Sequence, residues 1–177
     1  MRVLRAPTDV PSGGYDTIRF WAFQSETYDW KNFDLDRDLP VIVSKVGFVD
    51  AIDPDLTKFE AHGGKLILYA GWADTGFTPS TIAYHDSVVA RMGARQRVAR
   101  LFMVPGMGHC RGGVGPHTFD TIGALEAWRE RGFVPPEITA FNPESGLSRP
   151  LCAYPRYAKY NGGGNMKDAA NWRCVGP

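Results

Sequence analysis

The sequence lacks any hydrophobic run long enough to cross a lipid bilayer, because no window of about 18 apolar residues occurs in it. It also lacks an excess of charge, since 20 Lys and Arg face 19 Asp and Glu. This balance gives no electrostatic argument for a nucleic-acid or anionic-membrane partner. The opening residues have no apolar core of the kind found in secretory signals, which by itself favours a cytoplasmic protein. The 177 residues, 44% hydrophobic and 22% charged, suit one globular domain or a large part of one.

Cysteine is scarce, and the three cysteines form no C-x-x-C motif. Cys152 and Cys174 lie in a tail that is rich in Pro, Gly and Tyr and has little helical or strand periodicity. A disulfide between them would stabilise such a tail by roughly 3 kcal/mol in the chain-entropy description. Two free thiols are the alternative, and Cys110 is left over in either case.

Metal-binding patterns are also missing. Four aspartates fall close together within residues 28–38, but their spacing does not match a calcium-binding EF-hand loop. We interpret this segment as a solvated linker with a helix N-terminus. Cys110 and His117 supply only two of the ligands of a zinc site, and no H-x-x-x-H motif supports them. The sequence therefore predicts no metal site in this chain. The four aspartates are Asp29, Asp34, Asp36 and Asp38.

Two short apolar segments carry the main signal. The run LFMV at residues 101–104 is followed by a Pro-Gly turn and then by His109, and residues 65–70 lead through Gly71 to Asp74. Continuous apolar runs closed by Gly or Pro are typical of strands buried on both faces of a parallel sheet. Residues 79–92 begin with a Thr-Pro start signal and stop at a glycine, which predicts one helix between the two strands.

A strand–helix–strand unit is right-handed almost without exception, so the two strands are predicted to be parallel neighbours. Asp74 and His109 then lie at the carboxyl ends of these strands, where open α/β sheets bind their ligands. A carboxylate in this place can hold one imidazole nitrogen and leave the other free to accept a proton. The order Asp then His is that of the second half of a Ser…Asp…His hydrolase. His85, on the inward stripe of the intervening helix, is interpreted as a structural histidine with satisfied hydrogen bonds.

A nucleophilic serine is not recognisable. None of the seven serines stands in a G-x-S-x-G motif or follows a cysteine. Ser12 alone precedes two consecutive glycines, and no strand-like run comes before it. We therefore expect the chain to lack the nucleophile and most of the oxyanion hole. The seven are Ser12, Ser25, Ser44, Ser80, Ser87, Ser145 and Ser148.

Several motifs, taken together and in order, resemble the tannase and feruloyl esterase family. They are GWADTGFTP, VPGMGHCRGGVGP, TFDTIGALEAW, RPLCAYPRYAKYNG and DAANWRC. The resemblance covers nearly all of the chain from about residue 30 onward. It implies a serine carboxylic ester hydrolase that acts on esters of phenolic acids. By this resemblance Asp74 is the triad acid, His109 is the triad base, and Phe77 touches the aromatic ring of the substrate.

The resemblance also sets expectations for the fold. It implies the carboxyl-terminal part of an α/β-hydrolase fold, with parallel strands, flanking helices and a loop-rich, disulfide-linked tail. Residues 1–30 would be a remnant of the lid region returning to the core, and residues 31–177 part of the catalytic domain. It favours the Cys152–Cys174 disulfide over free thiols, and it implies that Cys110 pairs with a cysteine before the missing serine.

Further expectations concern partners and location. No cofactor is expected in this chain, whereas calcium is possible in the missing lid of the full-length protein. The expected partners are a small aromatic ester and the missing amino-terminal portion of the same enzyme, with no nucleic acid and no membrane. Because disulfides persist in oxidising compartments, the full-length protein is expected to be secreted or periplasmic.

Three functions remain open at this stage. The first is an ester hydrolase present as a fragment, which would be inactive alone for want of its serine. The second is a non-catalytic module, derived from an esterase and used for binding or assembly. The third is an enzyme assembled from two chains, with Cys110 forming a bridge between them.

The remaining segments give weaker structural predictions. Residues 17–23 have strand-like content, whereas Pro40 is expected in the first turn of a short helix. Residues 54–61 are predicted to form a helix that packs Leu56 and Phe59 inward. Trp72 is expected to pack under the loop that carries the acid.

A further helix is predicted after His117, up to the glycine at position 132. Its inward stripe is expected to consist of Phe119, Ile122, Leu125 and Trp128. Beyond Pro135-Pro136, residues 137–141 are predicted to form a short edge strand, and the rest is expected to be looped.

Overall fold

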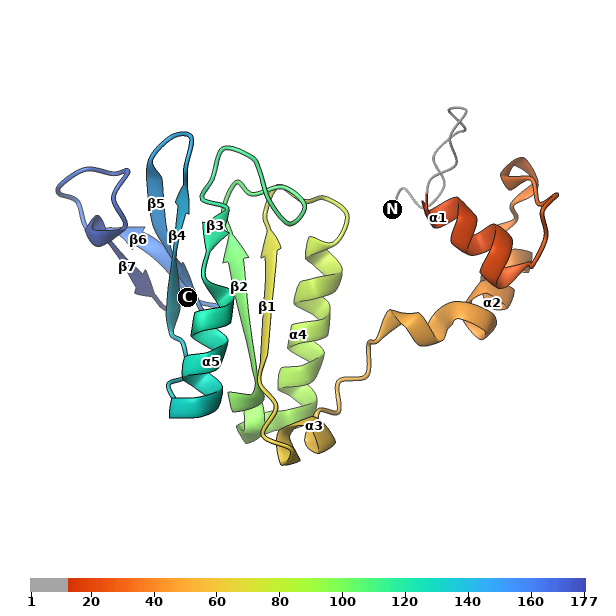
Figure 1. Ribbon diagram of the computed structural model, residues 1–177, viewed down its shortest axis with the longest axis horizontal. Coiled ribbons are helices and arrows are strands. Elements are labelled where there is room, and N and C mark those ends of the chain that lie inside the picture. The colour runs from red at the N-terminus through yellow and green to blue at the C-terminus, as the bar shows by residue number, and fades with distance from the viewer. Residues whose placement is uncertain (1–12) are drawn as a thin grey trace. The chain divides into compact units, whose positions relative to one another are not determined.

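A computed structural model describes residues 13–177, which fall into two compact units (Figure 1). The first unit is Met1–Ile52 and the second is Asp53–Pro177. This division lies later in the chain than the boundary expected after residue 30, and the assignment of the first residues to a lid stays a prediction. No helix of residues 13–177 is both long and apolar enough to span a membrane.

The first unit is helical in its described part. The prediction of a strand at residues 17–23 is wrong, because α1 runs directly into the π-helical turn η1. The backbone hydrogen bonds here are local, for example from the Phe23 amide to the Ile18 carbonyl. Aromatic and β-branched residues suggest a strand only weakly, and local hydrogen bonds override that preference here. The elements are α1 (Gly13–Asp16), η1 (Thr17–Ala22), η2 (Trp30–Asn32), α2 (Leu35–Val46) and η3 (Gly47–Asp50).

The aspartates before and within α2 form its amino-terminal cap. The Asp34 carboxylate accepts a hydrogen bond from the Arg37 amide at 2.8 Å, and Asp38 accepts one from the Asp34 amide at 2.9 Å. The Arg37 guanidinium also donates to Asp38 at 2.7 Å, and this bond lowers the pKa of that carboxyl group. Pro40 was expected in the first turn, which would place the helix cap at residue 39. The cap is instead Asp34, five residues earlier, so Pro40 lies inside α2.

The second unit contains the predicted strand–helix–strand unit. Strand β1 (Leu66–Gly71) pairs in parallel with β2 (Ala99–Val104), and α4 (Thr78–Met92) connects them, followed by the turn η4 (Gly93–Val98). The register joins Gly71 to Val104, so both strands end level with each other. Figure 1 shows the loops after β1 and β2 leaving from the same end of the strands. This confirms the predicted placement of the two loops.

The faces of the two strands are covered by different layers. Ile82, Val88 and Met92 of α4 pack on one face, in clusters that include Leu101 and Val98. On the other face Phe102 and Val104 pack with Ala124 of α5 and with the strands β4 and β5. Apolar side chains on both faces explain why β1 and β2 appear in the sequence as unbroken hydrophobic runs.

Helix α5 (Thr121–Arg131) is shorter than predicted. Thr118–Phe119 forms strand β3, and Asp120 caps the helix by accepting a hydrogen bond from the Gly123 amide at 2.8 Å. Of the predicted inward stripe, Trp128 is buried, whereas Ile122 is 65% exposed. Helix α3 (Thr57–Ala61) is likewise shorter than predicted, and Phe59 on it is exposed.

The tail contains three strands beyond β4, so the expectation of a looped tail is wrong. Strand β4 (Glu137–Asn142) is the middle strand of an antiparallel sheet, between β3 and β5 (Leu147–Cys152), and is not the predicted edge strand. A second pair follows, consisting of β6 (Tyr157–Tyr160) and β7 (Trp172–Val175), with the turn η5 (Ala169–Asn171) before β7. The predicted disulfide between Cys152 and Cys174 is present and joins β5 to β7.

Candidate functional site

The site begins where β1 and β2 end. Gly71 closes β1, and the amides of Trp72 and Ala73 donate to the carbonyls of Val104 and Met107 at 2.9 and 3.0 Å. These bonds extend the contact between the strands into the two loops that follow them. The Thr78 hydroxyl, at the start of α4, donates to the Gly71 carbonyl at 2.6 Å. The acid-bearing loop is therefore fixed at both of its ends.

Asp74 is held by three hydrogen bonds. One carboxylate oxygen, Oδ1, accepts from the amides of Gly76 and Phe77 at 2.9 and 3.3 Å. The other, Oδ2, accepts from Nδ1 of His109 at 2.7 Å. The Asp74 side chain is only 12% exposed. Hydrogen bonding from His109, helped by the Gly76 amide, lowers the pKa of Asp74, so the carboxylate form is favoured near neutral pH.

His109 presents its second nitrogen outward. Because Nδ1 donates to Asp74, the neutral ring carries its lone pair on Nε2. The His109 side chain is 61% exposed, and the structure records no partner for Nε2 among residues 13–177. The next residue, Cys110, adopts a positive φ of 62° and is an exposed free thiol. The two ring nitrogens of His109 are thus in different environments, one fixed and one open.

Phe77 lies directly beside the histidine. The centres of the Phe77 and His109 rings are 4.8 Å apart, with the planes tilted by 41°. Phe77 is 61% exposed, so its free face can contact an apolar ligand that approaches the imidazole. The structure places all three predicted site residues, Asp74, Phe77 and His109, within one connected group.

Several other candidates lie outside this group. His85 is buried on α4 against Tyr154, and its Nδ1 lies 3.5 Å from the Asp86 carboxylate, too far for a short hydrogen bond. His85 lies outside the group formed by Asp74, Phe77 and His109, in keeping with the interpretation of it as a structural histidine, although Nδ1 lacks the short hydrogen bond that this interpretation assumed. Burial lowers the pKa of His85 and favours the neutral ring. His117 pairs through Nε2 with Glu144 at 3.2 Å.

The serines of the second unit have other partners. The hydroxyls of Ser80, Ser87 and Ser148 donate to backbone carbonyls at 2.9, 2.7 and 3.3 Å. Ser145 accepts from the Leu147 amide at 3.4 Å. None of these four forms a hydrogen bond with His109 in the described part of the chain. Ser12 lies outside the described residues.

Two features of the site escaped the sequence analysis. Trp72 is 54% exposed and lines a cavity, so the expectation that it packs under the loop is wrong. The Thr78 hydroxyl anchors the loop, although its sequence pattern indicated only a helix start. In the sequence, the glycine at position 71 was the one sign of the close contact between β1 and the loop that carries His109.

An acid and a histidine joined by a hydrogen bond, at the carboxyl edge of a parallel sheet, have the same arrangement as the acid–base pair of α/β-hydrolases. The sequence profile described as tannase and feruloyl esterase matches residues 10–175. The chain belongs to this family of ester hydrolases.

Known proteins support this assignment. The chain is 36% identical to a mono(2-hydroxyethyl) terephthalate hydrolase from Piscinibacter sakaiensis, over 92% of this chain and 26% of the relative. It superposes on the crystal structure of feruloyl esterase B from Aspergillus oryzae with a TM-score of 0.80 and 25% identity. It superposes on tannin acyl hydrolase from Aspergillus niger with a TM-score of 0.72 and 26% identity. The two superpositions cover 94% and 93% of this chain, and 38% and 33% of the respective structures.

The chain is thus much shorter than the proteins it matches. It spans between 26% and 38% of the length of these three relatives. Its family follows from the match over most of its own residues, whereas the activity of a whole enzyme needs a separate argument.

Proposed function

We propose that this chain supplies the acid and the base of a serine carboxylic ester hydrolase. The observation that carries the proposal is the 2.7 Å hydrogen bond from His109 Nδ1 to Asp74 Oδ2, with the opposite ring nitrogen left open. In this arrangement Asp74 fixes the tautomer and stabilises the imidazolium that forms during the reaction. The nucleophilic serine is supplied by the remainder of a longer protein, of which this chain is the carboxyl-terminal part.

The reaction follows from the roles of these groups. The serine oxygen attacks the ester carbonyl carbon, and its proton passes to Nε2 of His109. The tetrahedral intermediate collapses, the bond to the alcohol oxygen breaks, and His109 returns the proton to that oxygen. Water then attacks the acyl-enzyme while His109 takes one of its protons, the bond between the acyl carbon and the serine oxygen breaks, and His109 returns the proton to that oxygen, which releases the acid and the free serine. General base catalysis of this type contributes about 10²–10⁴-fold to the rate.

The proposed substrates are esters of aromatic acids. Phe77 offers an exposed aromatic face next to His109, where the acyl group would lie during attack. Three relatives are named for terephthalate, feruloyl and tannin esters. A planar ring stacked on Phe77 would hold the ester carbonyl close to the imidazole.

The longer protein would also complete the chemistry of Cys110. By family resemblance, this exposed thiol would pair with a cysteine that precedes the nucleophilic serine. Such a bond would tie the serine loop to the histidine loop. Together with the Cys152–Cys174 disulfide, it supports export of the protein to an oxidising compartment, secreted or periplasmic. Calcium, where present, would be bound by the lid of the longer protein.

The test compares the chain alone with the chain joined to the sequence encoded upstream of Met1. The joined protein should hydrolyse methyl ferulate or methyl gallate and react stoichiometrically with a serine-directed phosphonate. The chain alone should do neither. Replacement of His109 by Ala in the joined protein should abolish turnover, whereas Glu130→Gln on α5 should not change it. Stoichiometric labelling of any serine in the chain alone would contradict the proposal.

A second function, that of a non-catalytic binding or assembly module, makes a different prediction. In that case the upstream sequence would encode no serine in an elbow motif, and joining it would produce no ester hydrolysis. The exposed Nε2 of His109 favours the catalytic proposal, because a purely structural Asp–His pair has no need for an open nitrogen.

A further inference from the structure

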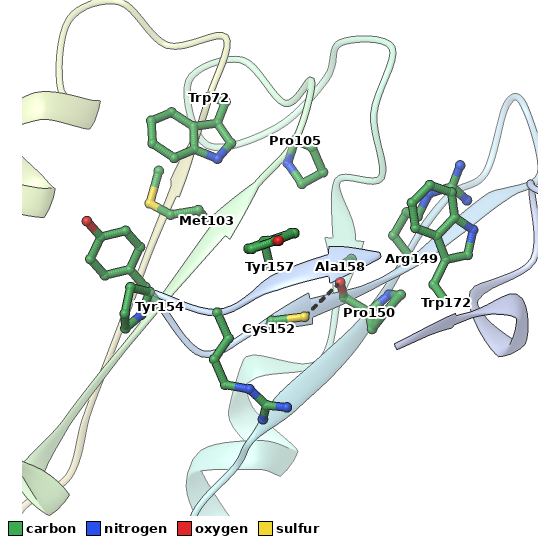
Figure 2. A pocket seen from close by; sticks show the side chains of 12 residues that line it. Trp72, Met103, Pro105, Arg149, Pro150, Cys152, Tyr154, Tyr157, Ala158 and Trp172 are labelled. Carbon is green, nitrogen blue, oxygen red and sulfur yellow. Dashed lines mark hydrogen bonds between the residues drawn. The ribbon is translucent and has the colours of Figure 1, made fainter. Parts of the chain in front are cut away.

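The cavity lined by Trp72 lies beside the site without including Asp74 or His109. It has a volume of about 320 Å³ and is bordered by the ends of β1 and β2 and by the strands β5, β6 and β7. Trp72, two residues before Asp74, forms the wall nearest to the catalytic loop (Figure 2). Neither Asp74 nor His109 lines this cavity, so its chemistry is separate from that of the Asp–His pair.

Four aromatic side chains line this cavity. Figure 2 shows Trp72, Met103 and Tyr154 at one end of it and Trp172 at the other, with Tyr157 between the two ends. Trp72 and Tyr157 are 54% and 53% exposed, although both are large apolar side chains. Exposed aromatic side chains that face a common concave space are typical of a site for a planar ligand.

The charge in this cavity has one sign. Arg149 and Arg156 border it, and no Asp or Glu does. The Arg149 guanidinium lies 4.0 Å from the centre of the Trp172 ring and donates to the Ser148 carbonyl at 2.6 Å. Arg156 donates to the Cys174 carbonyl at 2.6 Å. No carboxylate of the described residues forms an ion pair with either arginine.

Arg149 is the more informative of the two arginines. It is half-buried, and this burial lowers its pKa from the ordinary value, which reflects the cost of holding a cation away from water. Half-buried guanidinium groups are commonly paired with anions, whereas Arg149 stacks on Trp172 and donates to one backbone carbonyl, with no carboxylate partner among the described residues. Most N–H groups of Arg149 therefore remain available to an acceptor such as a carboxylate.

We propose that this cavity is a binding site for an aromatic carboxylate, with the ring against Tyr157 and the carboxylate on Arg149. The volume accommodates a single substituted ring, and the guanidinium fork matches the two oxygens of a carboxylate. The site would operate whether or not the chain supports ester hydrolysis. Aromatic acids are also what an enzyme of the proposed type releases, and Trp72 connects this site directly to the Asp74 loop.

The test is a titration of the full 177-residue chain, with tryptophan indole groups labelled for nuclear magnetic resonance. Benzoate should shift the signals of Trp72 and Trp172 and saturate in the millimolar range, whereas the signal of buried Trp128 should not move. Benzyl alcohol, which has the ring without the charge, and cyclohexanecarboxylate, which has the charge without the planar ring, should each bind at least about tenfold more weakly.

Two variants separate the roles of charge and ring. Arg149→Gln should weaken benzoate binding at least about tenfold, whereas Arg173→Gln, an exposed neighbour on β7 outside the cavity, should leave it unchanged. Tyr157→Leu removes an exposed ring without affecting the core, and should reduce the preference for benzoate over cyclohexanecarboxylate. Equal binding of the two acids, shifts that survive Arg149→Gln, or no saturable shift at all would each overturn the proposal.

Discussion

Gly71 at the end of β1 touches the backbone carbonyl of Met107, two residues before His109. A β-carbon at position 71 would overlap this carbonyl oxygen and that of Gly108. The glycine therefore lets the acid-bearing strand approach the base-bearing loop closely enough for Asp74 and His109 to form their hydrogen bond. The atoms in contact are backbone atoms on both sides, so no rotation of a side chain can relieve the steric clash that a larger residue would cause at this position.

The first prediction concerns this contact. Gly71→Ala should push the His109 loop away from β1, lower the free energy of unfolding by about 1–3 kcal/mol, and break the Asp74–His109 hydrogen bond. Gly163→Ala is the matched control, since a β-carbon there meets nothing within 4 Å, and its effect should stay within about 0.5 kcal/mol. Chemical denaturation measures both variants. Equal stability of the two would show that the loop can shift without cost.

The second prediction concerns Asp74 in the longer enzyme. Asp74→Asn keeps the shape of the side chain but replaces the acceptor that fixes the His109 tautomer, so kcat should fall about 10³–10⁴-fold. KM should change little, because no substrate contact is removed. Steady-state kinetics with methyl ferulate measures both constants. A fall of less than tenfold would mean that Asp74 does not orient the base.

The third prediction concerns the tail. The disulfide closes a loop with a sequence separation of 22 and joins β5 to β7. The double variant Cys152→Ala, Cys174→Ala should lose about 3 kcal/mol of unfolding free energy in the chain-entropy description. Cys110→Ala serves as the control for loss of a thiol and should have little effect on the chain alone. Reducing agent should destabilise the parent chain but not the double variant.

The central α/β unit could be predicted from the sequence because its signals are strong and local. Strand β2 is almost entirely buried and β1 is largely or partly buried except at Tyr69, so both appear as continuous apolar runs, and glycines lie at or just after their ends. The crossover rule then places Asp74 and His109 together without any knowledge of side-chain contacts. The site was predictable because it depends on topology more than on packing.

Other elements could not be predicted, for physical reasons that differ from one element to the next. Residues 17–22 carry strand-favouring side chains but form helical turns, because their backbone hydrogen bonds are satisfied locally. The strands β6 and β7 are short and partly exposed, so their periodicity is weak, and pairing with each other fixes them. The cavity beside Trp72 arises from residues of five strands or strand ends that are distant in sequence.

The last prediction concerns the pH dependence of stability at Asp55. Hydrogen bonds from Thr57, with a smaller contribution from Arg91, lower the pKa of Asp55 from 3.8 to about 2. The Asp55 carboxylate accepts from the Thr57 amide at 3.0 Å and from the Arg91 guanidinium at 2.6 Å. Because the folded state favours the ionised form, the stabilisation is fully present above pH 3.8 and is lost as the pH falls towards 2.

Asp55→Asn should therefore lower the melting temperature above pH 4 and have progressively less effect at lower pH, until the two curves meet near pH 2. Arg91→Gln should remove less of this pH dependence than Asp55→Asn does, because the bonds from Thr57 remain. Thermal melts of the chain between pH 2 and 6 provide the measurement, with Glu60→Gln on α3 as the control carboxylate. A constant difference between parent and Asp55→Asn across this range would contradict the assignment, since an interaction that does not titrate cannot depend on the ionised carboxylate.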